Sequence, residues 1–119
     1  MGVAFYHPPF SLVAMSSDVH NTLIKICGLT READVLACVQ AGANAIGFVM
    51  YPPSARYVSP ERAGILAKLL PPGTTPVLLF VNARLEDVQA ACQAVPNALL
   101  QFHGDESPDE CERLAHAVN

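Results

Sequence analysis

The chain has 119 residues, of which 51% are hydrophobic and 15% charged, a composition typical of a globular domain rather than a disordered or fibrous chain. Against 7 Lys and Arg stand 11 Asp and Glu, and no basic run occurs, which argues against nucleic acid or an anionic membrane as a partner. No apolar run approaches the roughly 20 residues that span a bilayer.

The four cysteines are far apart in the sequence, at positions Cys27, Cys38, Cys92 and Cys111. They form no C-x-x-C pair, and no His lies at zinc-ligand spacing, so we expect reduced thiols. The first twenty residues lack a basic region, and Pro8 and Pro9 interrupt the apolar core that a signal peptide needs. We therefore expect the cytoplasm as the compartment.

Residues 1–21 show no periodicity and are predicted to be a flexible extension, with Met15 as an alternative start. From residue 22 to 119, short apolar runs alternate with stretches of helical period, which predicts one α/β domain with a parallel sheet. The predicted strands are Thr22–Cys27, Ala45–Met50, Val77–Val81 and Ala98–His103.

Each predicted strand is followed by a predicted helix. The helices are Arg31–Ala41 capped by Thr30 and ended by Gly42, Ser59–Leu70 with Pro60 in its first turn, Arg84–Val95, and a last helix with a capping box at Ser107 and Glu110. In the last helix, Cys111, Leu114, Ala115 and Val118 form an apolar stripe. Cys38, Cys92 and Cys111 then lie on helices, where we expect them to act as small buried hydrophobic residues.

Parallel βα folds place their sites at the carboxyl ends of the strands. The polar residues predicted there are Cys27, Arg56, Asn82 and His103. Two prolines stiffen the loop that carries Arg56, and a fixed guanidinium suits capture of a carboxylate. Position alone leaves Cys27 and His103 open to a structural or a functional role, whereas we expect Asn82 to cap the third helix.

Strand alternation predicts that Lys25 shares a face with Cys27 and that Ile24 and Ile26 face the helices. Because an unpaired buried charge is costly, a Lys25 on the inner face would need a carboxylate partner.

Four segments in order, KICGLT (25–30), GFVMYPPSARYVS (47–59), FVN (80–82) and QFHGD (101–105), resemble phosphoribosylanthranilate isomerases. The resemblance covers the chain from about Thr22 onward. It implies the first four βα units of a (β/α)8 TIM barrel and the Amadori rearrangement of N-(5′-phosphoribosyl)anthranilate in tryptophan biosynthesis, without a cofactor or metal. It further implies that Cys27 is the general base, that Arg56 faces the anthranilate part of the substrate, and that His103 contributes to the substrate pocket.

The resemblance also implies that the general-acid Asp and the phosphate-binding loops lie beyond Asn119, since no carboxylate present, Asp105 included, matches that acid's motif. We therefore expect a truncated product or partial sequence that is inactive alone. Four units would leave the first and fourth strands with open edges, which invite a second copy or a separate C-terminal half.

Two alternatives remain open from the sequence. The first is a non-catalytic half-barrel that acts as a binding or self-assembly module. The second is a flavodoxin-like domain, which would need a phosphate loop after the first strand. The residues there, Gly28 to Arg31, make a poor one.

Overall fold

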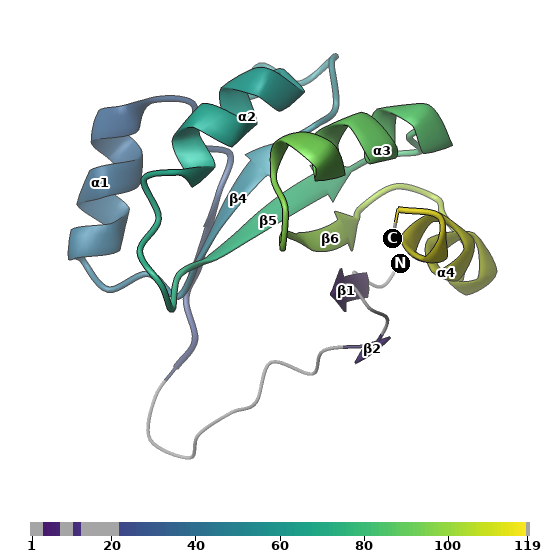
Figure 1. The fold of residues 1–119 in the computed structure, drawn as a ribbon, viewed down its shortest axis with the longest axis horizontal. Coiled ribbons are helices and arrows are strands. Elements are labelled where there is room, and N and C mark those ends of the chain that lie inside the picture. The colour runs from purple at the N-terminus through teal and green to yellow at the C-terminus, as the bar shows by residue number, and fades with distance from the viewer. Residues whose placement is uncertain (1–3, 8–10, 13–21, 119) are drawn as a thin grey trace.

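The structure is a computed structural model that describes residues 4–7, 11–12 and 22–118. Its strands form one six-stranded sheet in the order β2-β1-β6-β5-β4-β3 (Figure 1). The strands are β1 (Ala4–His7), β2 (Ser11–Leu12), β3 (Lys25–Cys27), β4 (Ala45–Val49), β5 (Thr75–Phe80) and β6 (Leu99–Phe102). The helices are α1 (Glu32–Gln40), α2 (Pro60–Ala67), α3 (Leu85–Ala94) and α4 (Pro108–His116).

From β3 onward, strands and helices alternate four times, and β3, β4, β5 and β6 pair in parallel in chain order. This confirms the predicted four βα units and their parallel sheet. Parallel neighbours all end at the same edge of the sheet, so the loops after these four strands meet there.

The two faces of the sheet differ in what they carry. The face toward the helices holds the large core side chains, which come from alternate positions of β4, β5 and β6: Ile46, Phe48, Leu78, Phe80, Leu100 and Phe102. Ile26 packs against this core as predicted, but Ile24 is 48% exposed because it precedes β3 rather than belonging to it. The opposite face carries the smaller cluster of Ala45, Val77 and Leu99.

Two of the predicted helix caps are confirmed. Ser59 Oγ accepts from the backbone N–H of Arg62 at 3.1 Å, with Pro60 in the first turn of α2. Ser107 and Glu110 form the reciprocal capping box of α4. The cap predicted at Thr30 is wrong, because α1 begins one residue later with Arg31 as its N-cap and no side-chain cap bond.

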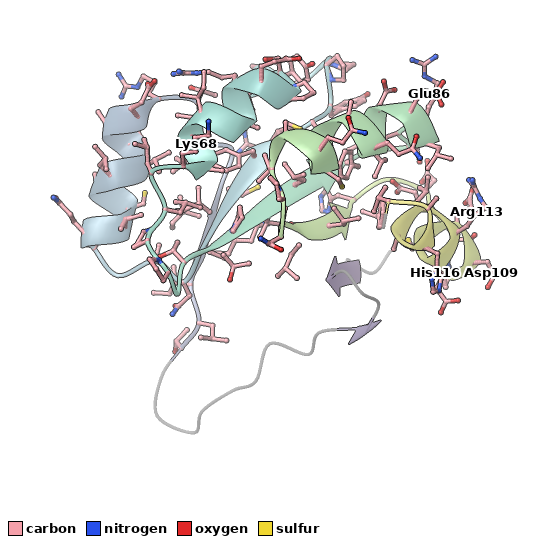
Figure 2. The ribbon with its side chains drawn as sticks, viewed as in Figure 1. Lys68, Glu86, Asp109, Arg113 and His116 are labelled. Atoms are coloured by element: carbon pink, nitrogen blue, oxygen red, sulfur yellow. The ribbon has the colours of Figure 1, made fainter. Side chains whose placement is uncertain are left out.

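The three helical cysteines contact the core as predicted, Cys111 buried and Cys38 and Cys92 partly buried. The outer sides of α3 and α4 carry exposed polar side chains, among them Glu86, Asp109 and Arg113 (Figure 2). Among the helices that the structure describes, none is long and apolar enough to cross a membrane.

The prediction of an open edge on the fourth strand is wrong, because β1 pairs antiparallel with β6. β1 also pairs with β2, while β3 at the other end of the sheet has β4 as its neighbour. The sequence predicts no element in residues 1–21, so these two strands are an addition to it. The predicted flexibility of residues 1–3, 8–10 and 13–21, and the alternative start at Met15, lie outside the described residues.

Candidate functional site

A pocket of about 380 Å³ opens at the carboxyl ends of the parallel strands. It is lined by Lys25, Cys27, Val49, Tyr51, Ser54, Arg56, Leu79, Val81, Gln101 and His103. The lining residues that belong to strands occupy alternate positions, so they lie on the face of the sheet that is opposite the helices. The structure thus brings the three residues singled out from the sequence, Cys27, Arg56 and His103, into one pocket.

Cys27 is the last residue of β3, and its thiol is free and half-buried. The chain turns sharply after it at Gly28, whose φ of 85° belongs to the left-handed region that favours glycine. The N–H of Gly28 still donates to the carbonyl of Gly47 at 2.9 Å, so the turn begins directly at the strand end.

Gly47 makes room for the thiol on the neighbouring strand β4. A Cβ atom at this position would lie 2.8 Å from Cys27 Sγ and 3.0 Å from Lys25 Cε, and both distances are too short for ordinary contact. The side chains of Cys27 and Lys25 are therefore neighbours above the bare backbone of Gly47.

Arg56 lies in the loop between β4 and α2, where its backbone N–H donates to Ser54 Oγ at 3.1 Å. Its Nη1 donates to the carbonyl oxygen of Cys27 at 3.3 Å, and its guanidinium covers Gly28, where a Cβ atom would lie 2.6 Å from Nη1. The guanidinium is thus held beside Cys27. It has five N–H donors in all, more than this one contact uses.

His103 follows β6 directly, and its backbone N–H donates to the carbonyl of Phe80 at 2.8 Å. Its side chain is exposed at the mouth of the pocket. Deeper in the pocket, Lys25 Nζ donates to Oε1 of the buried Gln101. This partner differs from the carboxylate predicted from the sequence, because a neutral amide oxygen accepts from the ammonium group instead.

The loops after β5 and β6 are joined by hydrogen bonds. Glu106 accepts from the N–H of Gly104 at 2.7 Å and from that of Asn82 at 3.0 Å, and Asn82 Oδ1 accepts from the N–H of Asp105 at 2.9 Å. The prediction that Asn82 caps the third helix is wrong, since Arg84 is the N-cap of α3 and the Asn82 amide is used between the loops.

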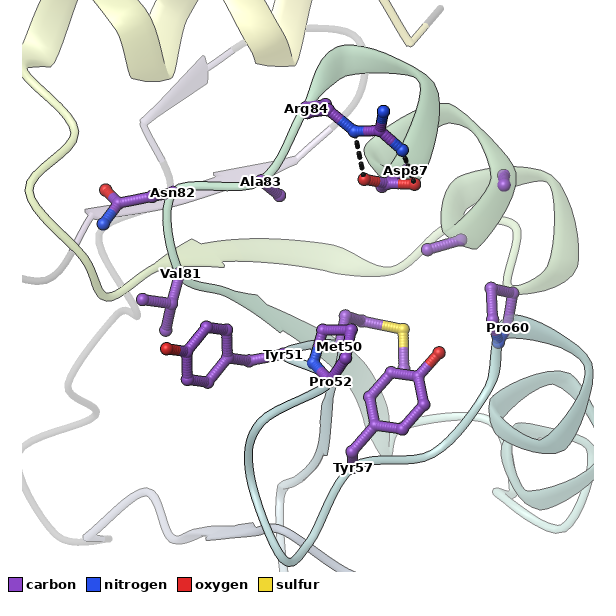
Figure 3. Close-up of a pocket in the computed structure, with 12 residues that line it drawn as sticks. Met50, Tyr51, Pro52, Tyr57, Pro60, Val81, Asn82, Ala83, Arg84 and Asp87 are labelled. Atoms are coloured by element: carbon purple, nitrogen blue, oxygen red, sulfur yellow. Dashed lines mark hydrogen bonds and ion pairs between the residues drawn. The ribbon is translucent and has the colours of Figure 1, made fainter.

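A second pocket, of about 470 Å³, lies between the β4–α2 loop and α3 (Figure 3). Tyr51 and Val81 line both pockets and so form the wall between them. On its far side, Arg84 Nε donates to Asp87 Oδ2 at 3.1 Å, the pair drawn with dashed lines in Figure 3.

The charge of the first pocket suits an anion. Its described lining holds two cations, Lys25 and Arg56, and the imidazole of His103, but no carboxylate. Within residues 4–7, 11–12 and 22–118, no three His, Cys, Asp or Glu residues are grouped so as to hold a metal ion. The arrangement therefore combines a thiol, which can exchange a proton, with fixed groups that can bind negative charge.

Comparison with known proteins gives consistent results. The family model described as N-(5′-phosphoribosyl)anthranilate (PRA) isomerase matches residues 24–119. An N-(5′-phosphoribosyl)anthranilate isomerase of Leptothrix cholodnii is 63% identical over 77% of this chain and 42% of its own length. One of Dechloromonas aromatica is 61% identical over 80% of this chain and 46% of its own length. The chain thus spans less than half the length of these curated relatives.

Solved structures agree with the sequence comparison. The phosphoribosylanthranilate isomerase of Thermotoga maritima superposes with a TM-score of 0.74 at 42% identity, covering 80% of this chain and 46% of the other. A phosphoribosylanthranilate isomerase in complex with reduced 1-(o-carboxyphenylamino)-1-deoxyribulose 5-phosphate gives a TM-score of 0.75 at 40% identity, covering 82% and 50%. The four parallel βα units correspond to the first half of the (β/α)8 barrel of these proteins. The chain belongs to the N-(5′-phosphoribosyl)anthranilate isomerase family.

Proposed function

We propose that this chain supplies the first half of the active site of a phosphoribosylanthranilate isomerase of tryptophan biosynthesis. The reaction is the Amadori rearrangement of N-(5′-phosphoribosyl)anthranilate to 1-(2-carboxyphenylamino)-1-deoxyribulose 5-phosphate. The observation that carries the proposal is that Cys27, Arg56 and His103, from the first, second and fourth βα units, line one pocket without a carboxylate in its described lining.

The contacts support a separate role for each residue. Cys27, as thiolate, removes the proton from carbon two of the opened sugar, and the electron pair of that C–H bond forms the enol-amine. Arg56, held against the carbonyl of Cys27, binds the anthranilate carboxylate close to this base. His103, at the mouth of the pocket, contacts the substrate through its imidazole.

Ring opening also needs a proton donor for the ring oxygen, and the substrate carries a phosphate. Because the chain spans less than half the length of its relatives, we propose that the acid and the phosphate-binding loops belong to the remainder of a complete barrel. This assignment needs no cofactor. We place the reaction in the cytoplasm, a proposal that the four free cysteines support.

The test uses a chimera in which residues 24–118 replace the matching segment of the Leptothrix cholodnii relative, which is 63% identical. We expect the chimera to isomerise the substrate and Cys27→Ser to lower kcat by about 10²-fold or more, the contribution typical of a general base. Cys38→Ala is the matched control, since Cys38 lies on α1 and does not line the pocket. An inactive chimera that is folded, or a Cys27→Ser variant with undiminished kcat, would contradict the proposal.

A second candidate function is a non-catalytic half-barrel that self-associates, and the position of β3 at the end of the sheet favours it. Unpaired strand edges accept strands from other chains. Sedimentation velocity of the 119-residue chain tests this second function. A stable oligomer would favour it, and a monomer would count against it.

A further inference from the structure

Glu106 and Asn82 are the side chains that connect the loop after β5 to the loop after β6. The Glu106 carboxylate accepts one N–H from each loop, from Asn82 at 3.0 Å and from Gly104 at 2.7 Å. In return, the amide oxygen of Asn82 accepts from the N–H of Asp105 at 2.9 Å. Hydrogen bonds to an ionised acceptor are roughly twice as strong as neutral ones, so this reciprocal arrangement holds the two loops together firmly.

The backbone at both ends of this connection is adapted to it. Asn82 has a φ of 49°, in the left-handed region that Asn tolerates better than most residues. At position 104, a Cβ atom would lie 2.7 Å from Asn82 Oδ1 and 2.8 Å from Glu106 Oε1, so only glycine lets the loops approach this closely. None of these groups lines the pocket.

The residues just before this connection do line the pocket. Val81 immediately precedes Asn82, and His103 immediately precedes Gly104. The N–H of His103 donates to Phe80, so β6 is anchored to β5 up to the same point. Beyond that point the paired strands end. The hydrogen bonds of Asn82 and Glu106 then fix the direction in which the two loops leave the sheet.

We propose that Glu106 and Asn82 are positioning residues, which set the place of His103 and Val81 in the pocket by locking the β5–α3 and β6–α4 loops together. This proposal rests on the proposed function, because it assigns the locked loops to the same substrate pocket. Neither residue touches the substrate in this assignment. Their effect on binding passes through the backbone.

Amide hydrogen exchange of the complete 119-residue chain tests the lock without any ligand. We expect Glu106→Gln, which keeps the shape but loses the charge and one acceptor, to speed exchange at Asn82 or Gly104 about tenfold. Asn82→Gly keeps the backbone angle but removes the acceptor, so we expect faster exchange at Asp105. Asp105→Asn is the control, since it removes a charge from the same loop and leaves all three bonds in place.

Binding of 2-aminobenzoate to the same variants tests the positioning role. This probe carries the carboxylate assigned to Arg56. We expect Glu106→Gln to weaken the affinity for 2-aminobenzoate about fivefold, since displaced groups in a pocket bind a ligand less well. Asp105→Asn should leave this affinity unchanged. A purely structural role would lower the melting temperature and leave this affinity unchanged.

Three results would overturn the proposal. Unchanged exchange in both variants would show that the loops are not locked, and unchanged affinity with faster exchange would show that the lock does not position the pocket. Equal loss of affinity in Asp105→Asn would assign the effect to charge alone. A wild-type chain that does not bind the probe would count against the proposed function instead, while the exchange rates would still decide whether the loops are locked.

Discussion

Gly47 lets the Cys27 thiol lie close against the backbone of β4, because its missing side chain leaves the space that Cys27 Sγ and Lys25 Cε occupy. We predict that Gly47→Ala destabilises the chain by about 1–3 kcal/mol, the typical cost of overpacking a filled site. Denaturant unfolding of the 119-residue chain measures this cost.

A double-mutant cycle assigns the clash to the sulfur. In a Cys27→Ala background the nearest atom to the new methyl group is gone, so Gly47→Ala should cost clearly less than it does in the wild type. Costs that simply add would mean that Lys25 Cε or the backbone, and not the thiol, resists the substitution.

Cys92 gives a prediction about the core rather than the site. Burial raises the pKa of its thiol to about 11, above the ordinary value of 9.0. Because only the thiolate reacts, we expect alkylation of Cys92 at pH 8 to be about a hundredfold slower in the folded chain than in urea. Peptide mapping after timed treatment with iodoacetamide measures both rates, and similar rates would show that the thiol is accessible and easily ionised.

The residues of the pocket show how far the sequence could predict the site. Cys27, Arg56 and His103 were predictable because parallel strands deliver their carboxyl ends to one edge. The roles of Gly47 and Glu106 were not, because a glycine inside a strand and a carboxylate before a helix look ordinary until the neighbouring strand or loop is known.

At the scale of elements, Arg62 of α2 connects the starts of two helices. Its Nη1 and Nη2 donate to the Glu32 carboxylate at 2.5 and 2.7 Å, and Nη2 also donates to the carbonyl of Thr30 at 3.0 Å. These hydrogen bonds from Arg62 lower the pKa of Glu32 from 4.5 to about 2. The pair therefore links the β3–α1 loop to α2, on the same edge of the sheet as the pocket.

This pKa shift predicts a pH dependence of stability. The folded-state pKa of Glu32 is below the unfolded one, so the pair stabilises the fold above about pH 4.5 and loses its effect as the pH falls toward 2. We expect Glu32→Gln to lower the melting temperature at pH 7 and to match the wild type near pH 2. Glu61→Gln, on the first turn of α2, is the control for charge loss. A Glu32→Gln effect that is the same at both pH values would contradict the pairing.

The helices also show where local sequence signals suffice. Ser59-Pro60 and the Ser107–Glu110 box were predictable because the cap and its partner lie within four residues of each other. The same local grounds predict caps at Thr30 and Asn82, but neither residue caps a helix, since the helices begin later, at Glu32 and Leu85. For Asn82, a hydrogen bond to a residue 23 positions away replaced the local one.

At the scale of the whole molecule, the sheet is parallel from β3 to β6 and continues beyond β6 through antiparallel pairs to β1 and β2. The sequence could not predict β1, because four residues without a clear alternation carry no strand signal by themselves. Their partner is β6, which lies near the other end of the sequence, so a local pattern does not reveal the pairing.

That edge is the basis of the last prediction. β1 covers it in a defined register, with Ala4 opposite Phe102, Phe5 opposite Gln101 and Tyr6 opposite Leu100. Deletion of residues 1–12 removes β1 and β2 and leaves the N–H and C=O groups of β6 without these partners, and such edges pair with other chains. We therefore expect the shortened chain to form dimers or larger species at concentrations where the full chain does not.

Sedimentation velocity over a range of concentrations measures this difference. A chain that begins at Ala4 is the matched control, because it keeps both strands and should behave like the full chain. The edge of β3 is the same in all three chains, so any change in association belongs to β6. If the chain without residues 1–12 sediments like the full chain at every concentration, then β1 does not protect the edge of β6.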